Sequence, residues 1–453
     1  MISPVGFCLL LVITTGAGRE LPAQTGRLTA TPADARIDEP VRLVVTGLRP
    51  ASKVILRSVM RVDSATAIVA SGTYFTDSQG VVNLERDAAR SGTYFGIEPM
   101  GLFWSGSRVP LDSLPREGMP SSEFDPPRAY SVVITALVND TVVARTVVTR
   151  RFGSANVIEE EVRSGDVVGR LFVPRSVRRP PVIIVLSGSE GGYESSAYRG
   201  RLLAAHGFAV FAQAYFRGPG LNDELASIPV ERVQRGIAWL RQRTDLSTER
   251  VAIIGSSRGT ELALLSAGLN REVSAVIVFG TSVTTGRGLT ASGEPHREAA
   301  WTLGGQPLPV MQIRPSAEAL SQFSKPDPVR LRLLFEPALS DVQAVAHAAI
   351  PVEKIRADVL IISGTDDQMG PADIAGDMLI ERLVRAGHEG RRVHLKYPEA
   401  GHLISIPFTP TELRLAPWRF AVGGSVRGYA RADADSWLQT LRFLRQSLPA
   451  AGR

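Results

Sequence analysis

The sequence predicts a multidomain protein in which an all-β sandwich precedes an α/β domain with a mostly parallel sheet. The chain has 453 residues, which is more than one ordinary domain needs. From residue 26 to residue 152, short β-branched or alternating runs stand between glycines and prolines, a pattern typical of a sandwich. From residue 157 to residue 449, strand-like runs alternate with helical ones, which indicates βαβ units.

Six strands are expected in the first domain, and each is short. They cover residues 28–31, 41–45, 53–58, 67–73, 81–84 and 129–137. This part of the sequence contains no motif for a nucleophile and no cluster of histidines. We therefore expect the first domain to be a structural or lid-like module.

The second domain begins with an apolar run at residues 181–186, which is typical of a strand buried on both faces. Further strands are expected at residues 208–212, 251–254, 275–279, 359–362 and 393–397. Helices are expected at residues 198–206, around 230–240, from residue 259 and at 437–448. Residues 281–355 are irregular and rich in proline, and we expect them to cap the site.

Composition excludes several classes of function. The net charge of +6 comes from 51 Lys and Arg against 45 Asp and Glu, and the arginines are scattered, with no basic arm interleaved with aromatics. We therefore expect no nucleic-acid partner and a solvated surface for most arginines, although some could face an anionic substrate such as a nucleotide-bearing thioester. Cys8 is the single cysteine, which excludes an internal disulfide, a cysteine-based metal site and a cysteine nucleophile in the body of the chain.

The first 24 residues are predicted to be a signal peptide. Residues 5–15 are apolar and are followed by small residues, a run of signal-peptide length that is too short to span a bilayer. Cleavage is expected after Ala17 or Ala23, with export to the periplasm or the medium. Because no Lys or Arg precedes the apolar run, a cytoplasmic location is the alternative.

The strongest chemical signal is a Gly-x-Ser-x-Gly motif made by Gly255, Ser257 and Gly259. It follows a predicted strand directly and precedes a predicted helix, which is the setting of the nucleophile elbow of an α/β-hydrolase. The helix that starts beneath the serine favours negative charge as it develops there. An ordinary helix-capping serine is the alternative interpretation.

Such a fold places its acid and then its base later in the chain. A predicted strand ends with Gly364, Asp366 and Asp367, and we predict that Asp367 is the acid, with Asp366 in reserve. His402 lies on a loop after the next strand and is the predicted base. The other five histidines are predicted to be surface or structural residues: His206, His296, His347, His388 and His394.

The oxyanion hole is predicted to use two backbone N–H groups. One belongs to Arg258, the residue after the nucleophile. The other is expected from Ser189 or Glu190, in the glycine-rich loop after the strand at residues 181–186. That loop lacks the Lys-Ser/Thr ending of a phosphate-binding P-loop, and no metal or cofactor is expected.

Several segments together resemble the acyl-CoA thioesterase and bile acid-CoA:amino acid N-acyltransferase family. They are residues 38–42 (DEPVR), 96–104 (GIEPMGLFW), 207–210, the Ser257 motif, 364–367 and 397–402. The resemblance implies an Ig-like β-sandwich at residues 26–152 and an α/β-hydrolase catalytic domain at residues 157–449. The sequence departs from the family pattern at residues 258–260, after Thr281 and in the predicted signal peptide.

The family uses Ser or Cys as nucleophile, and Ser257 resembles its thioesterase branch. The resemblance therefore implies a serine hydrolase that converts acyl-CoA to free acid and CoA, or cleaves related acyl esters. An acyl-CoA:amino acid N-acyltransferase is one alternative. A catalytically silent binding protein on the same scaffold is the other.

Overall fold

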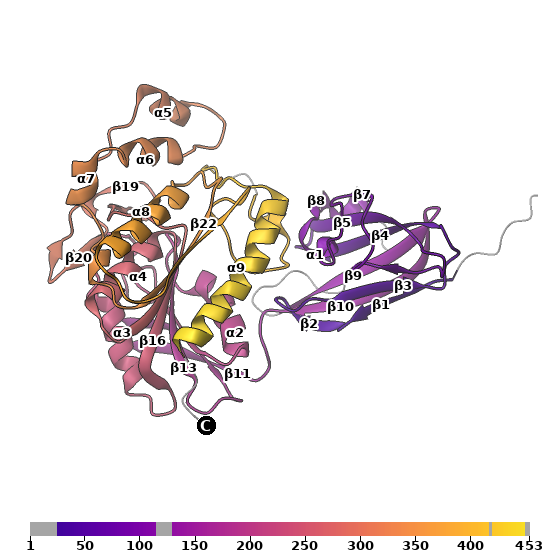
Figure 1. Ribbon diagram of the computed structural model, residues 1–453, viewed down its shortest axis with the longest axis horizontal. Helices are drawn as coiled ribbons and strands as arrows, with labels where there is room; N and C mark the ends of the chain where they lie inside the picture. The colour runs from indigo at the N-terminus through magenta and orange to yellow at the C-terminus, as the bar shows by residue number, and fades with distance from the viewer. Residues whose placement is uncertain (1–24, 115–128, 416–418, 449–453) are drawn as a thin grey trace, which may run out of the picture.

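The computed structural model describes residues 25–114, 129–415 and 419–448 (Figure 1). An amino-terminal part made almost entirely of strands lies beside a larger part in which helices cover a sheet. The signal peptide predicted at residues 1–24 lies outside the described residues. Among the described helices, none combines the length and the apolar character needed to cross a membrane.

The amino-terminal part contains two sheets. One has the order β1-β3-β6, and the other has the order β2-β10-β9-β4-β5-β7, with β8 pairing with β5. The bounds are β1 Arg27–Thr31, β2 Asp34–Arg36, β3 Arg42–Thr46, β4 Lys53–Arg61, β5 Thr66–Phe75, β6 Val82–Asn83, β7 Ser91–Gly92, β8 Ser107–Pro110, β9 Ala129–Val138 and β10 Thr141–Arg151. A short helix, α1 (Gly101–Trp104), is buried beside them. The six expected strands are confirmed within a few residues, whereas β2, β7, β8 and β10 were not anticipated.

The larger part is built on one sheet of eight strands in the order β11-β12-β14-β13-β16-β17-β22-β23. Strand β12 runs antiparallel to both of its neighbours, β11 and β14, and the strands from β14 onward are parallel to one another. The bounds are β11 Val157–Ser164, β12 Val167–Pro174, β13 Pro181–Leu186, β14 Ala209–Ala214, β16 Ser247–Ser256, β17 Val273–Phe279, β22 Asp358–Gly364 and β23 Arg392–Tyr397. This order is that of an α/β-hydrolase, which confirms the fold expected for this part of the chain.

Helices cover both faces of this sheet (Figure 1). On one face lie α2 (Glu194–Ala205) and α9 (Val426–Ser447), and on the other lie α3 (Glu231–Arg241), α4 (Arg258–Leu269) and α8 (Ala372–Arg385). The residues of β13 alternate between the two cores, with Ile183 and Val185 on the α2 face and Val182 and Ile184 on the α4 face. This burial on both faces explains why the strand reads as a continuous apolar run.

Between β17 and β22 the chain forms short elements in place of the irregular segment that we expected. They are β18 Arg287–Leu289, β19 Pro295–Ala299, β20 Trp301–Leu303, β21 Gln306–Pro307, α5 Ala317–Ser321, α6 Arg332–Ala338 and α7 Val342–His347. The three helices lie together at one end of the molecule (Figure 1). We call residues 281–355 the inserted segment.

The two parts of the chain are joined by buried polar contacts. The carboxylate of Asp38 accepts hydrogen bonds from His206 Nε2, at the end of α2, and from Trp437 Nε1, on α9. Thr411 Oγ1 donates to the Trp104 carbonyl over 3.1 Å. The amino-terminal part therefore rests against α2, α9 and the chain that follows His402.

Candidate active site

Ser257 lies at the sharp turn between β16 and α4. Its backbone has φ 49° and ψ −122°, a conformation that costs a non-glycine residue of order 1–3 kcal/mol and persists only where the surroundings enforce it. The Ser257 N–H donates to the Phe279 carbonyl at the end of β17 over 2.9 Å. The strained turn lifts the serine side chain above the carboxyl ends of the strands, as a nucleophile elbow requires.

The two glycines of the motif are required by close backbone approaches. A Cβ atom on Gly259 would lie 2.2 Å from the Ser187 carbonyl oxygen, and one on Gly255 would lie 2.4 Å from the Gly259 carbonyl oxygen. Both distances are shorter than real Cβ contacts. Only glycine at these positions lets α4 start so close to the strands.

His402 and Asp367 lie beside Ser257. The Nε2 atom of His402 is 2.9 Å from Ser257 Oγ, and its Nδ1 atom is 2.8 Å from Asp367 Oδ2. Because an ionised carboxylate can only accept, Nδ1 carries the proton, and in the neutral ring Nε2 is left free to accept from the serine hydroxyl. The other oxygen of Asp367 accepts the N–H groups of Met369 and Gly370 over 2.9 Å and 3.1 Å.

The neighbouring side chain of Asp366 is hydrogen-bonded to residues other than His402. Its side chain accepts from the Gly424 N–H over 2.8 Å and from the Gln368 amide over 2.6 Å. Asp366 is exposed, whereas Asp367 is fully buried against the imidazole. The geometry therefore joins Asp367, and not the reserve residue Asp366, to His402.

The pKa of His402 is raised above the ordinary value of a histidine. Burial of the ring opposes protonation, but the negative charge of Asp367, its hydrogen bond and the charge of Glu190 together outweigh that effect. The imidazolium form is therefore more stable here than in an ordinary histidine, which suits a group that must take a proton from a serine hydroxyl.

The residues predicted for the oxyanion hole flank Ser257. Arg258 is the first residue of α4, where backbone N–H groups have no partner within the helix. The loop of Ser189 and Glu190 lies on the other side, since a Cβ atom on Gly188 would be 3.1 Å from Ser257 Cβ. Tyr215 fixes this loop, because its hydroxyl oxygen lies 2.9 Å from the carbonyl oxygens of both Ser187 and Gly188, which share its single proton.

Two family models match the chain. The model described as "BAAT / Acyl-CoA thioester hydrolase C terminal" matches residues 228–450, and "Acyl-CoA thioester hydrolase/BAAT N-terminal region" matches residues 38–164. The chain belongs to the acyl-CoA thioester hydrolase/BAAT family.

Two curated relatives of this family are similar over nearly their whole length. Acyl-coenzyme A amino acid N-acyltransferase 1 of Mus musculus is 29% identical over 438 residues, which cover 94% of this chain and 99% of the relative. Acyl-coenzyme A thioesterase 6 of Homo sapiens is 28% identical over 426 residues, which cover 91% of this chain and 94% of the relative. Among solved structures, carboxyl esterase 2 of Tuber melanosporum matches 65% of this chain and 87% of its own at 18% identity, with a TM-score of 0.41.

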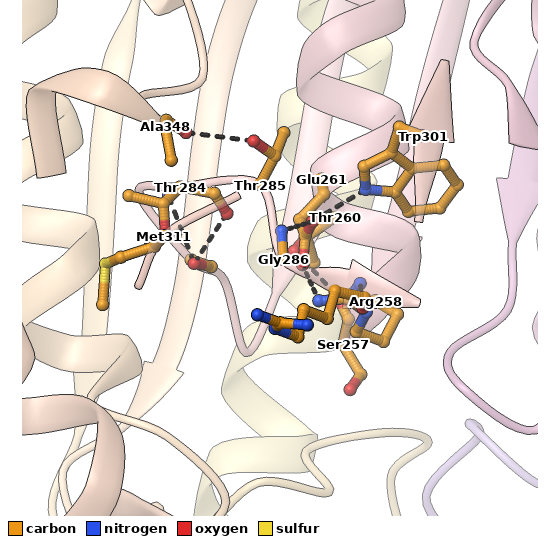
Figure 2. A network of polar contacts seen from close by, with 12 residues as sticks. Ser257, Arg258, Thr260, Glu261, Thr284, Thr285, Gly286, Trp301, Met311 and Ala348 are labelled. Atoms are coloured by element: carbon orange, nitrogen blue, oxygen red, sulfur yellow. Dashed lines mark hydrogen bonds and ion pairs between the residues drawn. The ribbon is translucent and has the colours of Figure 1, made fainter. Parts of the chain in front are cut away.

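A buried polar network ties the inserted segment of this family member to α4 (Figure 2). Glu261, which is 3% exposed, accepts from the Arg258 guanidinium, from Trp301 Nε1 over 2.7 Å and from the Gly286 N–H over 3.1 Å. Arg258 also donates to the Arg287 carbonyl over 2.7 Å. Glu261 was not anticipated from the sequence, although a charged residue inside an otherwise apolar helix is a signal that it has a buried partner.

The remaining histidines lie away from Ser257. His394 forms a second Ser-His-Asp chain, because its ring contacts Ser363 Oγ at 2.6 Å and Asp377 at 2.9 Å. Ser363, however, lies inside strand β22 and is 1% exposed, so no substrate can reach it. Among the residues that the structure describes, no group of three or more His, Cys, Asp or Glu side chains is arranged to hold a metal ion.

Proposed function

We propose that the protein is a serine hydrolase that cleaves acyl-CoA to free acid and CoA, or cleaves related acyl esters. Ser257 is the nucleophile, His402 the general base and Asp367 the residue that orients it. The hydrogen-bonded chain from Asp367 through His402 to Ser257, on a strained elbow, carries the proposal. Membership of a family with acyl-CoA thioesterases among its members supports the substrate class.

In the first half of the reaction, His402 Nε2 takes the hydroxyl proton while Ser257 Oγ attacks the carbonyl carbon of the acyl group. The oxyanion that results is bound by the N–H of Arg258 and by that of Ser189 or Glu190. When this intermediate collapses, the bond from carbon to the leaving group breaks. The proton on His402 passes to the leaving sulfur or oxygen, and the acyl group remains on Ser257.

In the second half, His402 removes a proton from water, and the hydroxide attacks the acyl-serine. The carboxylic acid leaves, and Ser257 recovers its proton from His402. An acyl-serine is an ordinary oxygen ester, which is less reactive toward an amine than the thioester that a cysteine would form. We therefore propose hydrolysis over transfer to an amino acid.

The test is a product analysis by mass spectrometry after reaction of an acyl-CoA with the protein in millimolar glycine or taurine. Free acid is expected as the main product, and non-CoA esters are expected to be cleaved as well. A dominant N-acylated amine would assign the protein to acyl transfer. No turnover of either substrate class would leave a binding protein on a hydrolase scaffold.

We propose further that residues 26–152 form an Ig-like β-sandwich domain and that residues 157–449 form the catalytic domain. The strands of the first part form sheets of their own, and none of them pairs with a strand of the eight-stranded sheet, which supports this division. We also propose that residues 1–24 are a cleaved signal peptide and that the mature protein is exported. Sequencing the amino terminus of protein from its native host tests this, and a chain that keeps residues 1–17 would refute export.

A further inference from the structure

The side chain of Glu190 folds back over its own loop. One carboxylate oxygen accepts from the Gly188 N–H over 3.1 Å and from Ser195 Oγ, on α2, over 2.6 Å. The Glu190 carbonyl accepts from the Arg217 guanidinium over 3.4 Å. These contacts hold the carboxylate in one place, although Glu190 is exposed.

The folded carboxylate lies next to the nucleophile. A Cβ atom on Gly188 would be 2.6 Å from Glu190 Oε2 and 3.1 Å from Ser257 Cβ, so the carboxylate and the serine flank the same point. The negative charge of Glu190 also raises the pKa of His402. A second carboxylate, on the loop after β13, therefore lies near the catalytic pair in addition to Asp367, which is on the loop after β22.

The other charged groups around His402 have partners of their own. On α4, Arg258 pairs with Glu261, and on α2, Arg199 donates to Ser256 Oγ. On α6, Arg332 pairs with Glu336 and Asp373 and donates to the Asp367 carbonyl.

Three further titratable groups around His402 are partnered as well. Asp366 accepts from the Gly424 N–H. On α9, Asp433 pairs with Arg414, and the Tyr429 hydroxyl accepts from the Leu403 N–H.

We propose that Glu190 is a positioning residue for the reaction, whose carboxylate stabilises the His402 imidazolium that forms as Ser257 gives up its proton. The proposal rests on the proposed function, because it assigns His402 as the base. Glu190 neither gives nor takes a proton and forms no bond to the substrate. It acts through its charge and its fixed place beside the Gly188 N–H.

The test replaces the charge and keeps the shape. Glu190→Gln retains an oxygen that can accept from Gly188 and Ser195, and Glu190→Asp retains the charge. Glu194→Gln is the matched control, because Glu194 is an exposed carboxylate nearby that accepts from the Tyr193 N–H and does not act on His402. Thermal unfolding of each variant checks that the fold is kept.

The pH dependence of kcat/KM for one acyl-CoA is measured for each protein. In Glu190→Gln the acidic limb should move to lower pH by roughly half a unit, because a negative charge near the imidazolium is gone. Glu194→Gln should leave the limb in place, and Glu190→Asp should return it toward the wild-type position. An unmoved limb in Glu190→Gln, or an equal shift in Glu194→Gln, would overturn the proposal.

A second measurement separates this proposal from the proposed function. The His402 ring can be titrated by NMR in the wild type and in Glu190→Gln, with no substrate present. A lower titration midpoint in the variant is expected even if acyl-CoA proves to be the wrong substrate. Equal midpoints would overturn the role of Glu190 and leave the hydrolase assignment untouched.

Discussion

His402 Nε2 lies 2.9 Å from Ser257 Oγ although 145 positions separate the two residues in the chain. The contact arises because β16 and β23 are parallel strands of one sheet, so the loops that follow them open at the same edge. Asp367 follows β22, the strand between β17 and β23, and reaches the imidazole from the same edge.

Replacing the proposed nucleophile should abolish turnover. We expect Ser257→Ala to lower kcat by on the order of 10⁴-fold or more, because the serine, histidine and aspartate act as a unit. Acyl-CoA hydrolysis is followed by release of free thiol, and circular dichroism checks the fold.

The second Ser-His-Asp chain offers the matched control. Ser363 also contacts a histidine paired with an aspartate, but it is buried within β22. Ser363→Ala should therefore keep near-normal kcat in the same assay. If loss of Ser363 stopped turnover while loss of Ser257 did not, the site would be misplaced.

The two neighbouring carboxylates should differ in effect. We expect Asp367→Asn to lower kcat by roughly 10³- to 10⁴-fold, because the amide no longer holds the tautomer of His402 or stabilises its charged form. Asp366→Asn should change kcat by less than about tenfold, since that side chain contacts Gly424 and Gln368. A reversal of the two effects would make Asp366 the acid.

The activity of the wild type should depend on pH through His402. As the proposed base, His402 acts as neutral imidazole, and its pKa is raised above the ordinary 6.5 by Asp367 and Glu190 against the effect of burial. We therefore expect kcat/KM to be constant at high pH and to fall as pH drops through a midpoint above 6.5. A midpoint well below 6.5 would show that the free enzyme's base is not this histidine.

The Glu261 network should stabilise the fold. In Glu261→Gln the side-chain NH₂ must face a hydrogen-bond donor, which is either Arg258 or the pair formed by Trp301 and Gly286. Because one of these buried hydrogen bonds is then lost, we expect the free energy of unfolding to fall by about 2–4 kcal/mol. Denaturant unfolding measures this. Glu381→Gln, which removes one half of an exposed pair with Arg385, is the control and should cost less than about 0.5 kcal/mol. Equal losses would argue against a special role for Glu261.

Asp38 should link the two parts of the chain in a pH-dependent way. Burial alone would raise its pKa, but His206, Arg36 and Trp437 lower it below the ordinary value. Because the pKa of Asp38 is lowered by folding, its ionised carboxylate stabilises the fold at pH values above the ordinary pKa of an aspartate. This stabilisation is lost as the pH falls through the lowered pKa of the folded state. Asp38→Asn should therefore be less stable than the wild type by about 2–4 kcal/mol at neutral pH, and the difference should shrink in acid. A difference that does not change with pH would contradict the ionic role.

Local pattern was sufficient to predict the elbow. The strand, the Gly-x-Ser-x-Gly turn and the helix are consecutive in sequence, so their arrangement follows from short-range chemistry. Helix α8 was missed although its buried residues Ala372, Ala375, Leu379 and Leu383 follow a helical spacing. Strand β10 was also missed: its Val and Thr residues favour a strand, but its apolar residues stand next to one another and do not alternate with polar ones.

The remaining features of the site depend on contacts between residues that are far apart in the sequence, so local pattern could not predict them. Asp366 and Asp367 are adjacent, and only the path of the loop directs Asp367 toward His402. Glu261 finds its partners Gly286 and Trp301 at 25 and 40 positions along the chain. The sequence suggested the Glu190 backbone as an oxyanion donor, but the place of its carboxylate depends on how the loop folds against Ser257.

The most direct test of the central claim is to trap the acyl group on the protein. The protein is mixed rapidly with an acyl-CoA, quenched in acid during the first turnover, digested and analysed by mass spectrometry. We predict that the acyl mass is found on Ser257 in the wild type and is absent from Ser257→Ala, which should release no CoA. An acyl group on another residue, or continued CoA release by Ser257→Ala, would contradict the account.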